Sequence, residues 1–226
     1  MLFLYLIGPI LQAQNLDQIR AHLKTLTGKA PLVLKAERQS WNRELKEGVV
    51  AEQGWVRAHL EASGAGMRVL PGTESASTPV KPGEPPRPLG DREATEILGA
   101  AEALLKTLAE GRFQSETAES RNGQPTRHLH FTLPLEDEAE ARKHLKEAWR
   151  TFDLWVRPDG TPMATYEAFQ IRGRVLFVRI EAGAQIRREY QMVGDRLVMV
   201  QENKEAHGSG MGQGSEGRST LTVSPL

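Results

Sequence analysis

The chain has no cysteine among its 226 residues. This absence excludes disulfide bonds, a cysteine nucleophile, cysteine-bound zinc and a lipid anchor on an N-terminal cysteine. A chain of this length can bury a hydrophobic core without covalent cross-links. We therefore expect one domain that is stabilised by packing alone.

An excess of charge of either sign is also missing, because 29 Lys and Arg residues balance 29 Asp and Glu residues. Proteins that bind nucleic acid usually carry clusters of basic residues, and no run of Lys or Arg occurs here. No apolar run reaches the length of about 20 residues that a membrane-spanning helix needs. We therefore expect neither a nucleic-acid partner nor a membrane span.

The apolar run at the N-terminus has the length of a signal peptide. It covers residues 2–11 and leads into Leu11-Gln12-Ala13, a small-residue cleavage context. We predict a signal peptide over residues 1–13 and a single domain over residues 14–226, which places the mature protein in the periplasm or outside the cell. The alternative is an apolar N-terminal strand within the fold, because no Lys or Arg precedes Arg20.

Hydrophobic periodicity predicts helices and strands in the first 135 residues. Apolar residues from Leu16 to Leu26 recur at three- and four-residue steps, which indicates a short helix. Strand-like segments follow at 31–44, 49–60 and 67–70, and six prolines make 71–90 a Pro-rich loop. A Leu-rich helix is predicted over 91–108, and a hairpin turns at Asn122-Gly123, the strongest short-range hairpin signal.

The remainder of the chain is predicted to begin with a third helix and to end in a long meander. The third helix starts near Glu136 and presents Leu145, Ala148, Trp149 and Phe152 to a core. From residue 153 the pattern has period two, with turn signals between successive strands. A Gly/Ser-rich stretch at 203–218 is predicted to be flexible before a last strand at 219–223.

No motif in the chain supports catalysis. The string Gly212-Gln213-Gly214-Ser215-Glu216-Gly217 matches the dinucleotide-binding G-x-G-x-x-G motif, but no helix follows it to receive a pyrophosphate. The H-E-x-x-H motif and the G-x-S-x-G elbow are both missing. We therefore predict no catalytic residue and no cofactor, and a hydrolase with an unrecognised site remains an alternative.

His128 and His130 form the only spacing with metal-ligand geometry, since alternate residues of a strand share a face. Counting from the Asn122-Gly123 turn places His128 opposite Thr117, and places Glu119 diagonally on the same face. Two histidines on a hairpin are more often solvated polar residues than ligands. We predict no metal and name His128, His130 and Glu119 as the residues that would bind one.

Aromatic residues and methionines concentrate on the predicted strands. A sheet lined in this way could present an apolar surface to a lipid or a peptide. The alternative is that these side chains form the core beneath the helices. The candidate groove residues are Trp41, Trp55, Trp155, Phe177, Tyr190 and Met199.

Three short strings and the order of elements carry a resemblance to a known family. The strings are Ala36-Glu37-Arg38-Gln39 after the first helix, Gly54-Trp55-Val56-Arg57, and Asp159-Gly160-Thr161-Pro162 before the final meander. In these features the chain resembles the periplasmic lipoprotein-carrier (LolA-like) superfamily. The resemblance implies an α+β fold with a strongly curved antiparallel sheet, a half-barrel with three helices over its concave face, enclosing a groove for acyl chains or an apolar peptide.

These observations lead to two hypotheses on function. The first is a monomeric, non-enzymatic periplasmic binding or carrier protein for a lipid, acyl chain or apolar peptide. The second is a structural or protein-interaction module of the cell envelope, in which the helices fill the groove and another envelope protein binds at the sheet edges or the Pro-rich loop.

Overall fold

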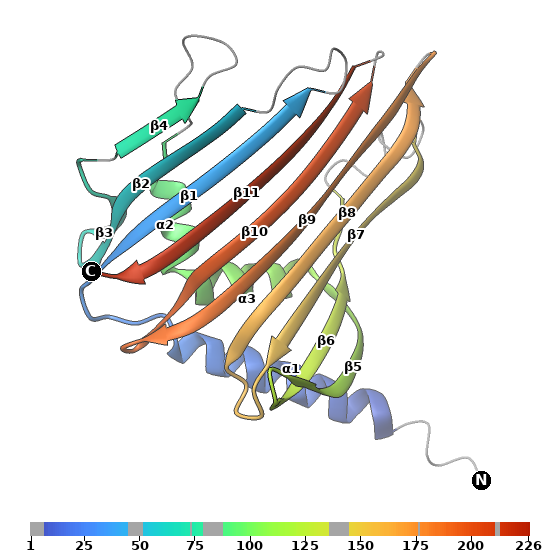
Figure 1. Ribbon diagram of the computed structural model, residues 1–226. Helices are drawn as coiled ribbons and strands as arrows, with labels where there is room; N and C mark the ends of the chain where they lie inside the picture. Colours follow the sequence, from blue (N-terminus) through green and yellow to red (C-terminus); the bar gives the residue numbers. More distant parts are fainter. Residues whose placement is uncertain are drawn as a thin grey trace.

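The computed structural model of the protein describes residues 7–44, 52–72, 74–78, 88–135, 145–175, 177–210 and 213–226. Within these residues the chain forms one antiparallel sheet of eleven strands and three helices (Figure 1). The predicted α+β class and antiparallel sheet are therefore confirmed. The helices are α1 (Ile7–Thr25), α2 (Asp91–Leu98) and α3 (Ala100–Glu110). The strands are β1 (Leu32–Glu44), β2 (Glu52–Ser63), β3 (Gly66–Val69), β4 (Glu74–Thr78), β5 (Arg112–Arg121), β6 (Gln124–Thr132), β7 (Leu145–Val156), β8 (Pro162–Val175), β9 (Val178–Val193), β10 (Arg196–Gly210) and β11 (Gln213–Pro225).

The sheet places the first and the last strand side by side in its interior. Its order is β3-β2-β1-β11-β10-β9-β8-β7-β6-β5, with β4 paired to the outer side of β2. The β1–β11 pairing runs from Leu34 opposite Pro225 to Glu44 opposite Ser215. Short connections join β2 to β3, β5 to β6, and each successive pair of strands from β7 to β11, and such connections force an antiparallel arrangement. The strong curvature implied by the resemblance stays a prediction.

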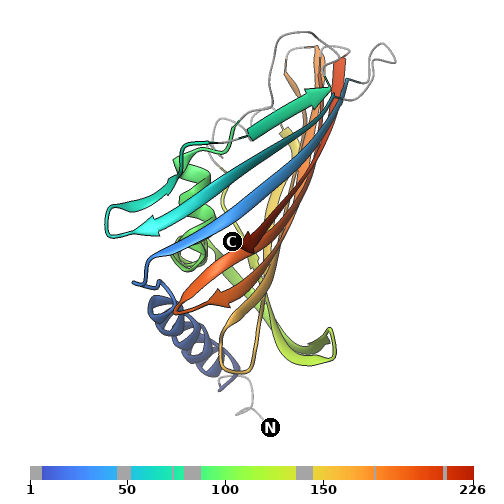
Figure 2. The same cartoon turned by 60° about the vertical axis from the view of Figure 1, so that its left-hand side comes forward.

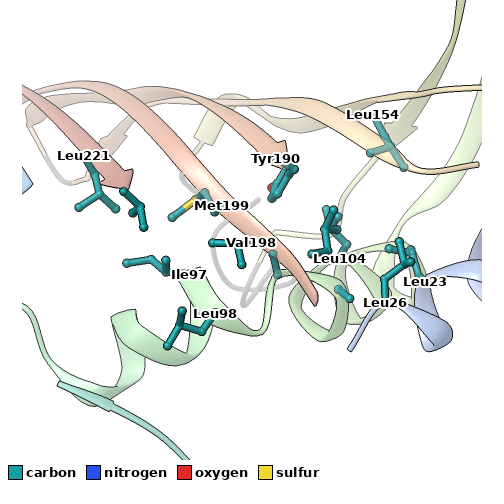
Figure 3. Close-up of a cluster of buried hydrophobic side chains, with 14 of the residues drawn as sticks. Leu23, Leu26, Ile97, Leu98, Leu104, Leu154, Tyr190, Val198, Met199 and Leu221 are labelled. Carbon is teal, nitrogen blue, oxygen red and sulfur yellow. The ribbon is translucent and has the colours of Figure 1, made fainter. Parts of the chain in front are cut away.

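The hydrophobic core lies between the helices and one face of the sheet (Figures 1 and 2). Strand side chains alternate between two faces, so every second residue can reach this core. Helix α2 contacts β2, β3 and β10, α3 contacts β10, and α1 contacts α3. Figure 3 shows Ile97 and Leu104 of the helices beside Met199, Tyr190 and Leu154 of the sheet. We call this face of the sheet the helix-covered face and the opposite one the helix-free face.

A clamp at the β9–β10 turn holds the connection between α1 and β1 in place. The Asp195 carboxylate accepts a hydrogen bond of 2.8 Å from the Lys29 backbone N–H, which lowers the pKa of Asp195. The buried Arg196 guanidinium donates to the carbonyl oxygens of Gly28 at 2.9 Å and Leu98 at 3.4 Å. The Arg196 side chain therefore connects the start of β10 to the end of α2 and to the segment that precedes β1.

The hairpin between β5 and β6 is confirmed in both turn type and register. Asn122 and Gly123 have φ angles of +52° and +76°, as a two-residue turn of this kind requires. Thr117 lies opposite His128, and Ser115 lies opposite His130. The local turn signal was therefore sufficient to fix the pairing of these two strands.

The third predicted helix is wrong, because β7 occupies residues 145–156. Phe152, Leu154 and Val156 alternate as buried residues, while β6 and β8 pair with the two sides of the strand. The apolar positions fit both a period of 3.6 and a period of two, and strand pairing overrides the helical reading. Residues 136–144 lie outside the described residues. The predicted helix over 91–108 is also divided at Gly99 into α2 and α3.

Within the flexible stretch predicted at 203–218, residues 203–210 and 213–218 also form paired strands. Strands β10 and β11 continue together from Gln201 opposite Thr222 to Gly210 opposite Gln213. Each also pairs on its other side, β10 with β9 and β11 with β1. Small Gly and Ser side chains contribute little packing, but backbone hydrogen bonds to neighbouring strands on both sides stabilise the extended conformation. The predicted Pro-rich loop contains β4, while residues 73 and 79–87 lie outside the described residues.

Helix α1 begins at Ile7 and so includes Ala13, the predicted cleavage position. Residues 1–6 lie outside the described residues, and export stays a prediction. No helix in the described part of the chain is long and apolar enough to cross a membrane.

Replacing Gly123 by valine should lower the free energy of unfolding by roughly 1–2 kcal/mol, because an L-residue is strained at positive φ. Gly64→Val is the matched control, since a side chain at either turn glycine meets open space and Gly64 has no positive φ. Chemical denaturation of both variants measures the difference. Equal stability of the two variants would contradict the turn geometry.

Candidate functional site

All four tryptophans of the chain lie on the helix-free face. Strand alternation places Trp41 and Trp55 opposite the buried residues of β1 and β2, such as Ala36 and Val56. In the same way, Trp149 and Trp155 point away from the buried side of β7. The structure thus separates the core residues under the helices from the indole rings on the other side.

Trp41 and Trp55 border one cavity of about 570 Å³ on this face. The two residues stand on adjacent strands, since Trp41 is opposite Gln53 and Trp55 is opposite Gln39. Both rings are partly exposed. We call this the indole cavity, and its lining residues are Glu37, Gln39, Ser40, Trp41, Gln53, Gly54, Trp55, Arg57, Arg218, Ser219 and Thr220.

An arginine accompanies each of these two tryptophans. The Arg57 guanidinium carbon lies 4.6 Å from the centre of the Trp55 ring, and that of Arg218 lies 5.8 Å from the centre of Trp41. Such cation–π contacts hold the indole rings in orientation. Arg57 also donates to the Glu37 carboxylate at 2.7 Å. This hydrogen bond, with one from Gln39, lowers the pKa of Glu37, so its carboxylate stays ionised at neutral pH.

A second cavity of about 340 Å³ adjoins the indole cavity along β1 and β11. The two cavities share Glu37, Gln39 and Thr220. We call it the hydroxyl cavity, because its remaining lining residues are Lys35, Thr222 and Ser224. A third cavity of about 210 Å³ continues the row over β9, β10 and β11 and shares Arg218 with the first.

The six groove candidates named from the sequence do not line one groove. Tyr190 and Met199 belong to the core on the helix-covered face, where burial raises the Tyr190 pKa and its hydroxyl lies 3.1 Å from Thr165 Oγ1. Phe177 is 96% exposed in the β8–β9 turn. Trp41 and Trp55 share the indole cavity, whereas strand alternation sends Tyr190 and Met199 to the opposite face.

Trp155 belongs to a separate cluster on the same helix-free face. Its ring stacks on His128 with 4.6 Å between centroids and 5° between planes. The Arg121 guanidinium lies 4.9 Å from the Trp155 ring centre, and the indole N–H donates to Glu119. These contacts orient the ring by packing and charge within the protein itself.

His128 and His130 share a face as expected, and both contact Asp153. The distances to Asp153 Oδ1 are 2.7 Å from His128 Nε2 and 2.8 Å from His130 Nδ1. Glu119 binds the indole of Trp155 instead. Within the described ranges, no group of three or more His, Asp or Glu residues is arranged to hold a metal ion.

Asp153 is a residue of the helix-free face that the sequence analysis did not single out. It lies opposite His130 in the β6–β7 pairing. Placing residues 145–152 in a helix hid this partner, whereas an extended reading of the Phe152, Leu154 and Val156 alternation would have found it.

The division between the two faces predicts different costs for truncating an aromatic residue on each. Phe152→Ala should lower the free energy of unfolding by about 3–5 kcal/mol, because the ring is fully buried. Trp55→Ala should cost roughly 1 kcal/mol or less, because the ring lies on an open face. Urea titration of both variants tests this. A larger loss for Trp55 would contradict the assignment of the faces.

Comparison with known proteins finds similarity to a solved structure. No protein-family model matches the chain, and no curated protein matches its sequence. A crystal structure of the LolA superfamily protein NE2245 from Nitrosomonas europaea matches 95% of this chain and 94% of its own, with 8% identity and a TM-score of 0.28. The description of that protein names the superfamily that the sequence resembles.

Proposed function

We propose that the protein is a non-enzymatic binding protein of the periplasm, which carries a lipid or another amphiphile with an acyl chain in the indole cavity. The observation that carries this proposal is the pair Trp41 and Trp55 on adjacent strands at one cavity. Its volume falls within the range of about 300–1,000 Å³ that is typical of small-molecule sites.

The indole pair suits an apolar chain because each ring offers a large, rigid apolar surface. Each square ångström of apolar surface removed from water contributes about 25 cal/mol of stabilisation. An apolar chain that covers the exposed surface of both rings would therefore be bound favourably. The cation–π contacts of Arg57 and Arg218 hold the rings in orientation before the ligand arrives. Binding then costs little side-chain entropy.

The cellular location rests on the N-terminal apolar run and the Ala13 cleavage context. Carriage of a poorly soluble molecule between membranes requires no covalent step, which fits a chain without a recognisable catalytic motif. The half-barrel curvature and monomeric state implied by the LolA-like resemblance belong to the same proposal.

An interaction module of the cell envelope is the second candidate, and strand β5 favours it. This strand ends the sheet, and most of its side chains are exposed. An open strand edge can accept a strand from another protein. Charged residues along β5, such as Glu116 and Glu119, oppose uncontrolled pairing of this kind.

The double variant Trp41→Ala, Trp55→Ala should bind a fluorescent fatty-acid analogue at least tenfold more weakly than the unmodified protein, because both apolar walls of the indole cavity are removed. Fluorescence titration measures the affinity, and circular dichroism verifies the fold.

Trp149→Ala is the matched control for this experiment. Trp149 is also on the helix-free face and is 41% exposed, but it does not line the indole cavity. Its loss should leave the affinity unchanged. Equal weakening by the control, or no binding of the analogue by the unmodified protein, would refute the proposal.

A further inference from the structure

The helix-free face changes chemical character along β1 and β11. At one end, Trp41 lies opposite Arg218, and the register then proceeds through Gln39 opposite Thr220 and Glu37 opposite Thr222 to Lys35 opposite Ser224. Six residues of strand separate Trp41 from Lys35, a length of about 20 Å. An aromatic end and a hydroxyl-bearing end therefore belong to one continuous surface.

The hydroxyl cavity offers both donors and acceptors of hydrogen bonds. Thr220, Thr222 and Ser224 are exposed. The hydroxyls of Thr222 and Ser224 can each donate once and accept twice, whereas Thr220 Oγ1 donates to Asn203 Oδ1 at 3.0 Å and can still accept. The Gln39 side-chain amide also does both, and its N–H group donates to Glu37 Oε1 at 3.3 Å. A ligand group that likewise donates and accepts at several neighbouring atoms would match this lining.

The charged residues at the hydroxyl cavity balance each other and do not favour a headgroup of either sign. Its lining contains one cation, Lys35, and one anion, Glu37. The nearby Arg57 is held by Glu37 at 2.7 Å and stacks on Trp55. The cavity therefore has no cluster of cations for an anionic headgroup, and no cluster of anions for a cationic one.

We propose that the ligand is an amphiphile with an uncharged polyhydroxyl headgroup, such as a sugar. Its apolar chain lies in the indole cavity, and its headgroup lies in the hydroxyl cavity against the Thr220, Thr222 and Ser224 row. This inference rests on the proposed function, because it names the headgroup of the ligand that the indole cavity holds. The shared residues Gln39 and Thr220 stand at the junction of chain and headgroup.

The test compares three monomeric amphiphiles with the same ten-carbon chain: decyl maltoside, decyl sulfate and decyl phosphocholine. Each displaces the fluorescent fatty-acid analogue from the full-length protein below its micelle concentration. Decyl maltoside should bind at least tenfold more tightly than the other two. Thr222→Val should reduce this preference, because valine keeps the shape of threonine and removes its hydroxyl.

Thr117→Val is the matched control, since Thr117 is an exposed strand threonine that lines neither cavity. It should preserve the preference for the maltoside. Equal affinity for the three amphiphiles, or tighter binding of either charged headgroup, would overturn the inference while leaving the proposed function standing. Failure of all three amphiphiles and of the fatty-acid analogue to bind would overturn both.

Discussion

The alternation of side chains along long, fully paired strands is the constraint on which the candidate site depends. Because successive residues point to opposite faces, burying Leu34, Ala36 and Val56 under the helices obliges Trp41 and Trp55 to face the other way. If β1 or β2 shifted by one residue relative to its neighbours, its buried residues and its tryptophan would exchange faces. Core packing therefore sets the position of the indole cavity, although the cavity lies outside the core.

Continuous register extends this effect across the whole sheet. Starting from a residue on β2, the directly opposite residues can be followed across seven further strands, and all of them lie on the same face. The β9–β10 pairing has a local irregularity after Met199. Indole, amide, hydroxyl and charged groups are thereby placed in one transverse row. That row comprises Trp55, Gln39, Thr220, Asn203, Arg187, Tyr166, Asp153 and His130.

Local signals predicted local structure well, and long-range pairing decided the remainder. The Asn122-Gly123 turn fixed its hairpin register, because turn geometry is determined by neighbouring residues. Residues 145–152 and 203–218 were misassigned, because their strands are stabilised by partners far along the chain. Trp41 and Trp55 were identified as candidates, but their shared cavity follows from pairings that no local pattern contains.

The central claim is that the ligand binds on the helix-free face and not between the sheet and the helices. Photo-crosslinking with a fatty acid that carries a diazirine at the end of its chain, followed by peptide mapping, tests it directly. The account predicts crosslinks on β1 and β2 in the peptides that contain Trp41 and Trp55. Crosslinks confined to α2, α3 and the Tyr190–Met199 region of the core would contradict it.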